Sequence, residues 1–212
     1  ERTRYFDAAC EDVTYNIDGK VDAIVSAGDI AENGLLCEYQ YISEKLAGAR
    51  TNCFINAVGN HDVRLKASYK KTVRNFMSFT NELNKSVGSD FTIDSLHYSY
   101  EINGYRFIVL GTDRTEFEES YISEAQLCWL DAQLTEASKT GKPIFVMIHQ
   151  PLKWTHGLPD TWNSPIDSAG SVGAQSDSLK YFLNKYDNVF LITGHLHTGI
   201  GKFTYEKIGN FH

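Results

Sequence analysis

The stretch "NVFLITGHLHTG", residues 188–199, joins an apolar run to a glycine and two histidines. Val, Phe and Ile favour strands that are at least half buried, whereas histidine is polar and a common metal ligand. The pattern predicts a strand that ends just before His195 and His197. Two such side chains at the end of a strand indicate a site rather than a part of the core.

Three further apolar runs also end in polar residues. "VDAIVSAGD" (21–29) ends in Gly28-Asp29, "CFINAVGNHD" (53–62) ends in "GNHD", and "KPIFVMIHQP" (142–151) contains His149. In an open α/β sheet, ligands bind outside the carboxyl ends of the strands, where loops from separate strands converge. We therefore expect the four polar ends to meet at one place.

Helix-like segments alternate with these strand-like runs, which is typical of an α/β fold. Asn103-Gly104 separates two β-rich segments within residues 97–113 and predicts a tight hairpin turn. Ser123 and Gln126 have the spacing of a capping box, followed by an apolar stripe at helical spacing. We expect helices at residues 35–46, at about 69–83 and, with a capped start, at 176–186. A further helix is expected to begin at Ser123, with Leu127, Leu130 and Leu134 in the core.

The chain has 212 residues, of which 42% are hydrophobic, and this length predicts a single domain over residues 1–212. No apolar run approaches the roughly 20 residues of a membrane span, and no signal-peptide pattern opens the chain. Because the sequence begins with Glu1 rather than Met, we expect a piece that is incomplete at its N-terminus, and its final hairpin-like segment suggests the same at the C-terminus. The compartment, cytoplasmic or secreted, is left open.

The net charge of −7 argues weakly against a partner bound through its phosphate backbone, so the sequence gives no strong sign of a nucleic-acid partner, with a local basic pocket as the alternative. The four cysteines show no CxxC spacing, which leaves core thiols as the expectation and a disulfide as the alternative.

The side chains at the strand ends form a mixed oxygen and nitrogen donor set. Aspartate supplies a charged oxygen that can bridge two cations, asparagine a neutral oxygen and histidine a nitrogen, which suits Mn, Fe or Zn better than Ca or Mg. Two cations about 3.5–4 Å apart can activate a water as hydroxide and stabilise both oxygens of a phosphoryl transfer. The chemistry predicted is phosphoester hydrolysis.

The motifs "GD" (28–29), "GNHD" (59–62), "H" (149) and "GHLH" (194–197) resemble, in order, those of the calcineurin-like metallophosphoesterase superfamily. "GNHDVR" and the long loop after His149 resemble its cyclic-nucleotide phosphodiesterase and purple-acid-phosphatase-like branches. The resemblance implies a four-layer sandwich in which helices flank two mixed β-sheets.

The resemblance also implies a role for each matching residue. Asp29 matches the aspartate that bridges both metals, His197 a ligand of the first metal, and Asn60, His149 and His195 ligands of the second. His61 matches the general acid or orienting histidine near the leaving group, and Asp62 would hold its tautomer. Arg64 could contact a substrate phosphate, with a surface ion pair as the alternative.

The family's first motif, Asp-x-His, does not occur in this sequence: no histidine precedes His61. The chain therefore keeps two ligands of the first metal and four of the second. We expect an asymmetric site that holds one ion or none in this piece, and two in an active full-length protein.

The segment from about Leu152 to Ala174 is rich in Gly, Pro and Ser and predicts a functional loop. Trp154, His156 and Trp162 are candidate substrate contacts, or aromatics that pack back onto the body. The substrate expected is a small phosphomonoester or phosphodiester, such as a nucleotide. Two alternatives are a catalytically degenerate scaffold of the same fold and a nuclease of the same superfamily, and the acidic composition weighs against the nuclease.

Overall fold

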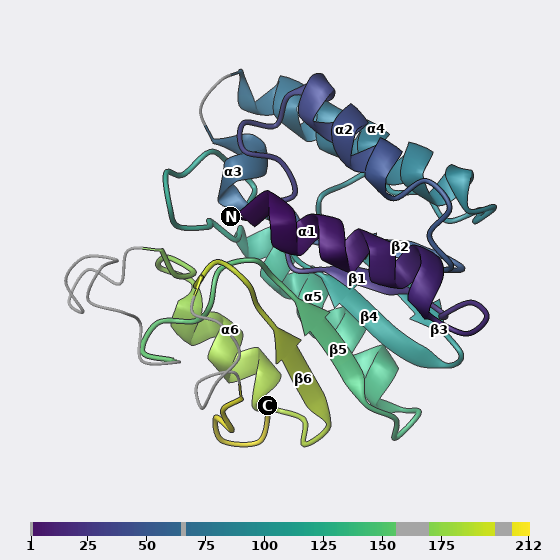
Figure 1. Cartoon of the computed structure of the whole chain (residues 1–212). Coiled ribbons are helices and arrows are strands. Elements are labelled where there is room, and N and C mark those ends of the chain that lie inside the picture. Colours follow the sequence, from purple (N-terminus) through teal and green to yellow (C-terminus); the bar gives the residue numbers. More distant parts are fainter. Residues whose placement is uncertain (1, 65–66, 156–169, 198–204) are drawn as a thin grey trace. The chain divides into compact units, whose positions relative to one another are not determined.

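The computed structural model describes residues 2–64, 67–155, 170–197 and 205–212 (Figure 1). The chain forms two compact units. Unit 1 comprises residues 1–26, 30–56 and 61–95, and unit 2 comprises residues 27–29, 57–60 and 96–212. The single domain expected over residues 1–212 stays a prediction.

Unit 1 has a small parallel sheet and two long helices. Strands β1 (Ile24–Ser26) and β2 (Phe54–Asn56) pair in parallel, and helices α2 (Leu36–Lys45) and α4 (Tyr69–Ser86) lie side by side. The rings of Tyr39 and Phe79 stack at a centroid distance of 4.8 Å, and Phe76 is fully buried beside them. Because α4 also contacts β2, these aromatic rings form the core of the unit.

The N-terminal half contains further helical segments. Helix α1 (Arg2–Glu11) continues into a π-helical turn, η1 (Asp12–Asn16), and α3 (Asn60–Val63) follows β2 after three residues. The strand predicted within residues 53–62 is confirmed as β2, and the "NHD" segment that follows Gly59 is helical, in α3.

Unit 2 has a four-stranded mixed sheet. Its strand order is β3 (Tyr98–Ile102), β4 (Tyr105–Val109), β5 (Ile144–Met147) and β6 (Val189–Ile192), with β3 and β4 antiparallel and the other pairs parallel. The hairpin turn is confirmed: Asn103 and Gly104 have φ of 51° and 80°, as a two-residue turn with two left-handed residues requires.

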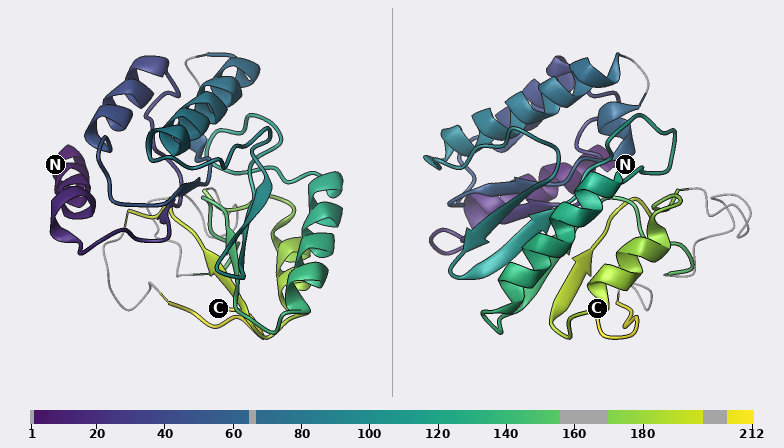
Figure 2. Two further views of the ribbon diagram at one scale, coloured as in Figure 1. Left: turned by 90° about the vertical axis from the view of Figure 1, so that its right-hand side faces the viewer. Right: turned by 180° about the vertical axis from the view of Figure 1, so that it is seen from behind.

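Helices α5 (Glu124–Ser138) and α6 (Ser176–Leu183) cover one face of this sheet (Figure 2). Leu127, Leu130 and Leu134 are buried there, as the helical spacing predicts. Ser123 caps α5 by accepting a hydrogen bond from the N–H of Gln126 at 3.2 Å, but the Gln126 side chain binds Gly111 and Asp113 instead of completing a capping box. Helix α6 has no side-chain cap at Gln175, so the capped start predicted for it was wrong.

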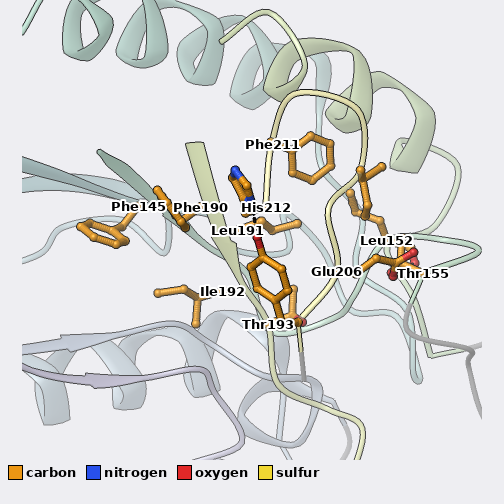
Figure 3. A pocket seen from close by; sticks show the side chains of 12 residues that line it. Phe145, Leu152, Thr155, Phe190, Leu191, Ile192, Thr193, Glu206, Phe211 and His212 are labelled. Atoms are coloured by element: carbon orange, nitrogen blue, oxygen red, sulfur yellow. Dashed lines mark hydrogen bonds between the residues drawn. The ribbon is translucent and has the colours of Figure 1, made fainter. Parts of the chain in front are cut away.

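The C-terminal residues lie along the outer edge of β6. The backbone N–H of Leu191 donates to the carbonyl of His212, and the His212 ring stacks on Phe190 at 5.0 Å. A cavity of about 190 Å³ lies at this place. The rings of Phe145, Phe190 and Phe211 line it (Figure 3). The hairpin expected at the C-terminus is represented in the described residues by one isolated bridge, Ile208 to Phe211.

The two sheets and their helices confirm the predicted mixed α/β class, although the sheet of unit 1 has only parallel pairing in its described residues. None of the helices among the described residues is both long and apolar enough to cross a membrane. All four cysteines are free thiols, but only Cys10 and Cys53 are buried, so the expectation of core thiols was wrong for Cys37 and Cys128.

Candidate functional site

Four of the predicted metal ligands follow directly on strands. Asp29 comes three residues after β1, Asn60 four after β2, His149 two after β5 and His195 three after β6. All four belong to unit 2, because this unit includes the short segments that follow β1 and β2. The carboxyl ends of the strands therefore supply the polar groups, as the sequence pattern predicts.

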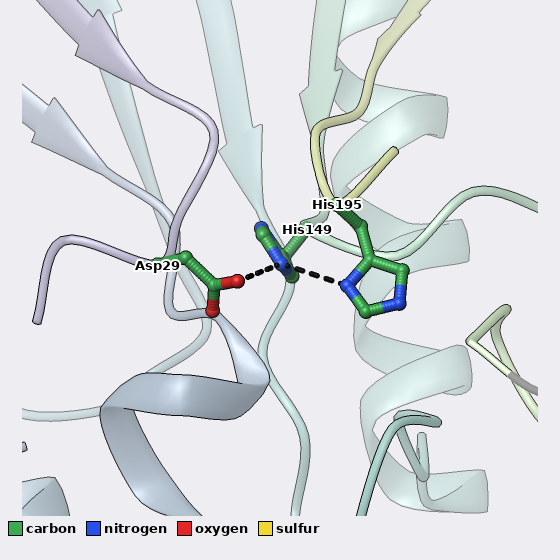
Figure 4. Close-up of side chains that lie close together, drawn as sticks. All are labelled: Asp29, His149 and His195. Carbon is green, nitrogen blue, oxygen red and sulfur yellow. Dashed lines mark hydrogen bonds and ion pairs between the residues drawn. The ribbon is translucent and has the colours of Figure 1, made fainter. Parts of the chain in front are cut away.

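Asp29, His149 and His195 converge on one point (Figure 4). The Oδ2 atom of Asp29 lies 3.0 Å from Nε2 of His149, which lies 3.2 Å from Nδ1 of His195. One ligand atom from each residue falls within 4.8 Å of the other two. His149 and His195 are buried, and the Asp29 side chain is 15% exposed. The site is thus a small, largely dry cluster of two ring nitrogens and a carboxylate.

The protonation of His149 is determined by its other nitrogen. Nδ1 lies 2.7 Å from the backbone carbonyl of Ala27, and a carbonyl oxygen can only accept a hydrogen bond. Nδ1 therefore carries a proton, and in the neutral ring Nε2 carries a lone pair. This lone pair points at a carboxylate oxygen of Asp29, which is also an acceptor. Such an arrangement is favourable only with a cation between the two atoms or with a second proton on the ring.

Asn60 supplies a further acceptor beside the cluster. Its Oδ1 atom is buried and accepts no hydrogen bond from the residues that the structure describes. Its Nδ2 group donates to Oε2 of Glu118 at 2.9 Å and to the carbonyl of Phe117 at 3.3 Å. A buried, unsatisfied acceptor costs about 1–3 kcal/mol, and a metal ion would remove that cost.

Glycines and strained residues allow the strand ends to approach one another. Asp29 and His195 have φ of 52° and 67°, values that non-glycine residues adopt at a cost. A Cβ atom on Gly28 would lie 2.6 Å from Nδ1 of His149, and one on Gly59 would lie 2.1 Å from Oδ1 of Asp29. The space that these side chains need exists only because residues 28 and 59 are glycine.

The fifth predicted ligand, His197, is exposed and does not belong to the cluster of Asp29, His149 and His195. It follows His195 by two residues on the segment after β6. The structure brings together Asp29, His149 and His195, and the role of His197 as a ligand of the first metal stays a prediction.

His61, Asp62 and Arg64 belong to unit 1. Nδ1 of His61 lies 2.9 Å from Nη2 of Arg64 and 3.1 Å from Oε1 of Glu32. The Asp62 carboxylate is fully buried and accepts hydrogen bonds from the backbone and from Tyr39. The predicted role of Asp62 in holding the His61 tautomer stays a prediction, and Glu32 is a neighbour of His61 that the sequence did not indicate.

The loop after His149 is described only at its start. Trp154 is 61% exposed and has a φ of 62°. His156 and Trp162 lie outside the described residues. A role for these three residues in substrate binding stays a prediction.

The comparisons with known proteins agree with this geometry. A family model described as calcineurin-like phosphoesterase matches residues 3–199. The chain belongs to this family. The match contains all four motifs that carry the resemblance, so the family assignment made from the sequence is confirmed.

Two relatives are glycerophosphodiester phosphodiesterases named GpdQ. The protein from Enterobacter lignolyticus is 26% identical over 143 residues, which are 66% of this chain and 46% of the relative. The probable GpdQ from Arcobacter nitrofigilis is 26% identical over 185 residues, 86% of this chain and 59% of the relative. The chain thus spans about half the length of these relatives.

Two solved structures share the fold. The purple acid phosphatase PPD1 from yellow lupin seeds has a TM-score of 0.58 at 16% identity, over 91% of this chain and 33% of that protein. A dimetal phosphatase from Danio rerio has a TM-score of 0.60 at 16% identity, over 94% and 74%. At this identity the likeness is evidence for the fold alone.

The site contains one residue that no sequence motif indicates. Glu118 lies in the acidic run "EFEE" (116–119), between β4 and α5, where no motif marks it. Only the folded chain brings it to Asn60, which is 58 residues away in the sequence.

Proposed function

We propose that this chain is the catalytic part of a metal-dependent phosphoester hydrolase, and that Asp29, Asn60, His149 and His195 hold one of its cations. The observation that carries the proposal is the pair of acceptors at the centre of the cluster. Nε2 of His149 faces Oδ2 of Asp29 at 3.0 Å, while the Nδ1 proton of the ring is bound to the carbonyl of Ala27. A cation satisfies both acceptors at once.

The residues present fit a transition metal. Two oxygens, from Asp29 and Asn60, and two ring nitrogens, from His149 and His195, form a mixed donor set. Such a set suits Mn, Fe or Zn better than Ca or Mg, which prefer all-oxygen sites. The orphaned Oδ1 of Asn60 supports its place in this set.

A second cation would be held on the other side of Asp29, with His197 as a further ligand. Asp29 has a second carboxylate oxygen with which it could bridge the two ions. This chain supplies four ligands for one cation and two for the other, so the two sites differ in affinity. The site of Asn60, His149 and His195 is the tighter of the two.

Each cation would supply Lewis-acid stabilisation of the phosphoryl oxygens and lower the pKa of an attacking water. His61 would donate a proton to the leaving oxygen, since an alkoxide leaves readily only when it is protonated or otherwise stabilised. Arg64 and Glu32 contact its Nδ1 and would set the orientation of the ring. Arg64 could also pair with a substrate phosphate.

The substrate proposed is a small phosphodiester or phosphomonoester, such as a nucleotide or a glycerophosphodiester. Two relatives are named as phosphodiesterases of the latter kind, which supports this class. Trp154, His156 and Trp162 would contact the organic part of the ester. The net charge of −7 weighs against a long nucleic acid as substrate.

The test is turnover of a generic aryl phosphate and an aryl phosphodiester by the full-length protein with Mn²⁺. Asn60→Ala removes a proposed ligand, and Asn52→Ala, at an exposed position before β2, is the matched control. We expect Asn60→Ala to lose most of the turnover and Asn52→Ala to keep it. Equal rates in all three proteins would overturn the proposal and favour a scaffold without catalysis.

A further inference from the structure

Glu118 lies beside two of the proposed ligands. Its side chain is 20% exposed and comes from the loop between β4 and α5. The Oε2 atom accepts a hydrogen bond from Nδ2 of Asn60 at 2.9 Å and lies 3.9 Å from Nε2 of His195. One carboxylate oxygen therefore faces both residues.

The backbone around Glu118 is held at the same place. The carbonyl of Glu118 accepts a hydrogen bond from Nε2 of Gln150 at 3.2 Å, and the carbonyl of Phe117 accepts one from Nδ2 of Asn60 at 3.3 Å. Gln150 is buried and directly follows His149 in the chain. These contacts limit the movement of the Glu118 carboxylate relative to the cluster.

The hydrogen bond between Asn60 and Glu118 determines which atom of the Asn60 amide can face a cation. Nδ2 is occupied by Glu118 and Phe117, so Oδ1 is the atom left to face a cation. Without an acceptor at Nδ2, the amide could turn and present its N–H groups, which cannot bind a metal.

The contact with His195 concerns its tautomer. Nδ1 of His195 is the atom that joins the cluster, 3.2 Å from Nε2 of His149, and a nitrogen that binds a metal carries no proton. The proton of the neutral ring is then on Nε2, the atom that faces Glu118. At 3.9 Å the Glu118 oxygen lies beyond hydrogen-bonding distance of this nitrogen, so its negative charge favours that tautomer through electrostatic attraction.

We propose that Glu118 is a positioning residue of the metal site: one carboxylate oxygen orients the amide of Asn60 and favours the Nε2–H tautomer of His195. This inference rests on the proposed function, since it assumes a cation held by these residues. Glu118 acts through Asn60 and His195 and does not bind the ion itself. Residues that orient metal ligands in this way typically change metal affinity about 10–100-fold.

The test compares Mn²⁺ binding to the full-length protein by isothermal titration calorimetry in wild type, Glu118→Ala and Glu118→Gln. Glu119→Gln is the control, because it makes the same charge change at the next residue. We expect Glu118→Ala to raise the Kd of the tighter site about 10–100-fold. Glu118→Gln keeps an oxygen acceptor and should recover part of the affinity, and the control should match wild type.

A second readout separates positioning from a general loss of structure. In the Zn²⁺-loaded, ¹⁵N-histidine-labelled protein, we expect an Nε2–H signal for His195 that is protected from exchange in wild type and lost in Glu118→Ala. Thermal unfolding without metal shows whether each variant folds. An unchanged Mn²⁺ affinity and an unchanged His195 signal in Glu118→Ala would overturn the inference.

Two other outcomes are distinguishable. If Glu118→Gln loses Mn²⁺ as completely as Glu118→Ala while the His195 signal remains, Glu118 is a direct ligand and the positioning role is wrong. If His149→Ala binds Mn²⁺ as wild type does, the metal site itself is wrong, and the proposed function fails together with this inference.

Discussion

Asp62 in unit 1 and Asp29 in unit 2 are both buried or nearly so, yet their surroundings differ. The Asp62 carboxylate is fully buried and accepts hydrogen bonds from the N–H groups of Ala31 at 2.8 Å and Ile30 at 3.3 Å, and from the hydroxyl of Tyr39 at 3.0 Å. The Asp29 carboxylate faces Nε2 of His149, whose lone pair points toward it.

The difference separates a structural carboxylate from a ligand. Asp62 has donors enough to balance its buried charge, so it stabilises the fold as it stands. The Oδ2 atom of Asp29 faces the lone pair on Nε2 of His149, and a cation or a proton between these two atoms removes their repulsion. The nature of the surrounding groups, rather than burial alone, indicates which of the two binds a metal.

The largest expected effect comes from removing Asp62. Asp62→Ala leaves two backbone N–H groups and a tyrosine hydroxyl without an acceptor, and should lower the free energy of unfolding by about 3 kcal/mol or more. Asp29→Asn in the metal-free protein should keep or raise this free energy, because an amide N–H can donate to His149. Urea unfolding in EDTA measures both. A larger loss of stability for Asp29→Asn than for Asp62→Ala would contradict the comparison.

Gly59→Ala tests the close approach at Asp29. The new Cβ would lie 2.1 Å from Oδ1 and 2.3 Å from the backbone nitrogen of Asp29, and forcing such a contact costs about 1–3 kcal/mol. We expect a weaker Mn²⁺ affinity together with a lower stability. Gly88→Ala, which has φ of 80° and no atom within 4 Å of the new Cβ, should lose some stability and keep its affinity.

Tyr39→Phe removes a hydroxyl donor to Asp62. A hydrogen bond to a charged group contributes about 1.5–3 kcal/mol. Because the N–H groups of Ala31 and Ile30 still donate to the carboxylate, we expect the free energy of unfolding to fall by about 1.5 kcal/mol. Tyr181→Phe, at a side chain that is 65% exposed, should leave it unchanged. An equal effect in both variants, measured by urea unfolding, would show that Asp62 is not balanced by Tyr39.

The smallest expected effect on stability concerns Glu119, whose carboxyl group differs in its surroundings from those of Asp62 and Asp29. Burial raises its pKa above the usual value, because desolvation disfavours the charged form. A raised folded-state pKa of an acid means that stability is lost as the pH rises through that range. Glu119→Gln should therefore be slightly more stable than wild type at neutral pH, and the advantage should shrink below about pH 4, where wild type is protonated as well. A constant difference between pH 3 and pH 8 would be incompatible with this cause.

Much of the fold and of the metal cluster could be predicted from local signals. Apolar runs mark the strands, Asn103-Gly104 marks the hairpin, and Asp29, His149 and His195 each follow the carboxyl end of a strand, which is β1 in one sheet and β5 and β6 in the other. These features depend on a few neighbouring residues, which one sequence contains in full.

The rest depends on contacts between distant residues. Gln126 has the spacing of a capping residue, but Gly111 and Asp113 offer its side chain better-placed partners. Asp62 is next to His61 in the sequence, yet its carboxylate binds Ala31 and Tyr39. Glu118 meets Asn60 only in the folded chain. Hydrogen bonds of this kind leave no periodic trace in a sequence.

The most direct test of the metal cluster is the amount of Mn²⁺ retained by the full-length protein after equilibrium dialysis, in wild type and in His149→Ala. His97→Ala is the control, since this histidine packs on Trp129 through its ring. We predict that His149→Ala retains one equivalent fewer than wild type and that His97→Ala retains the same amount. Equal retention by wild type and His149→Ala would contradict the account.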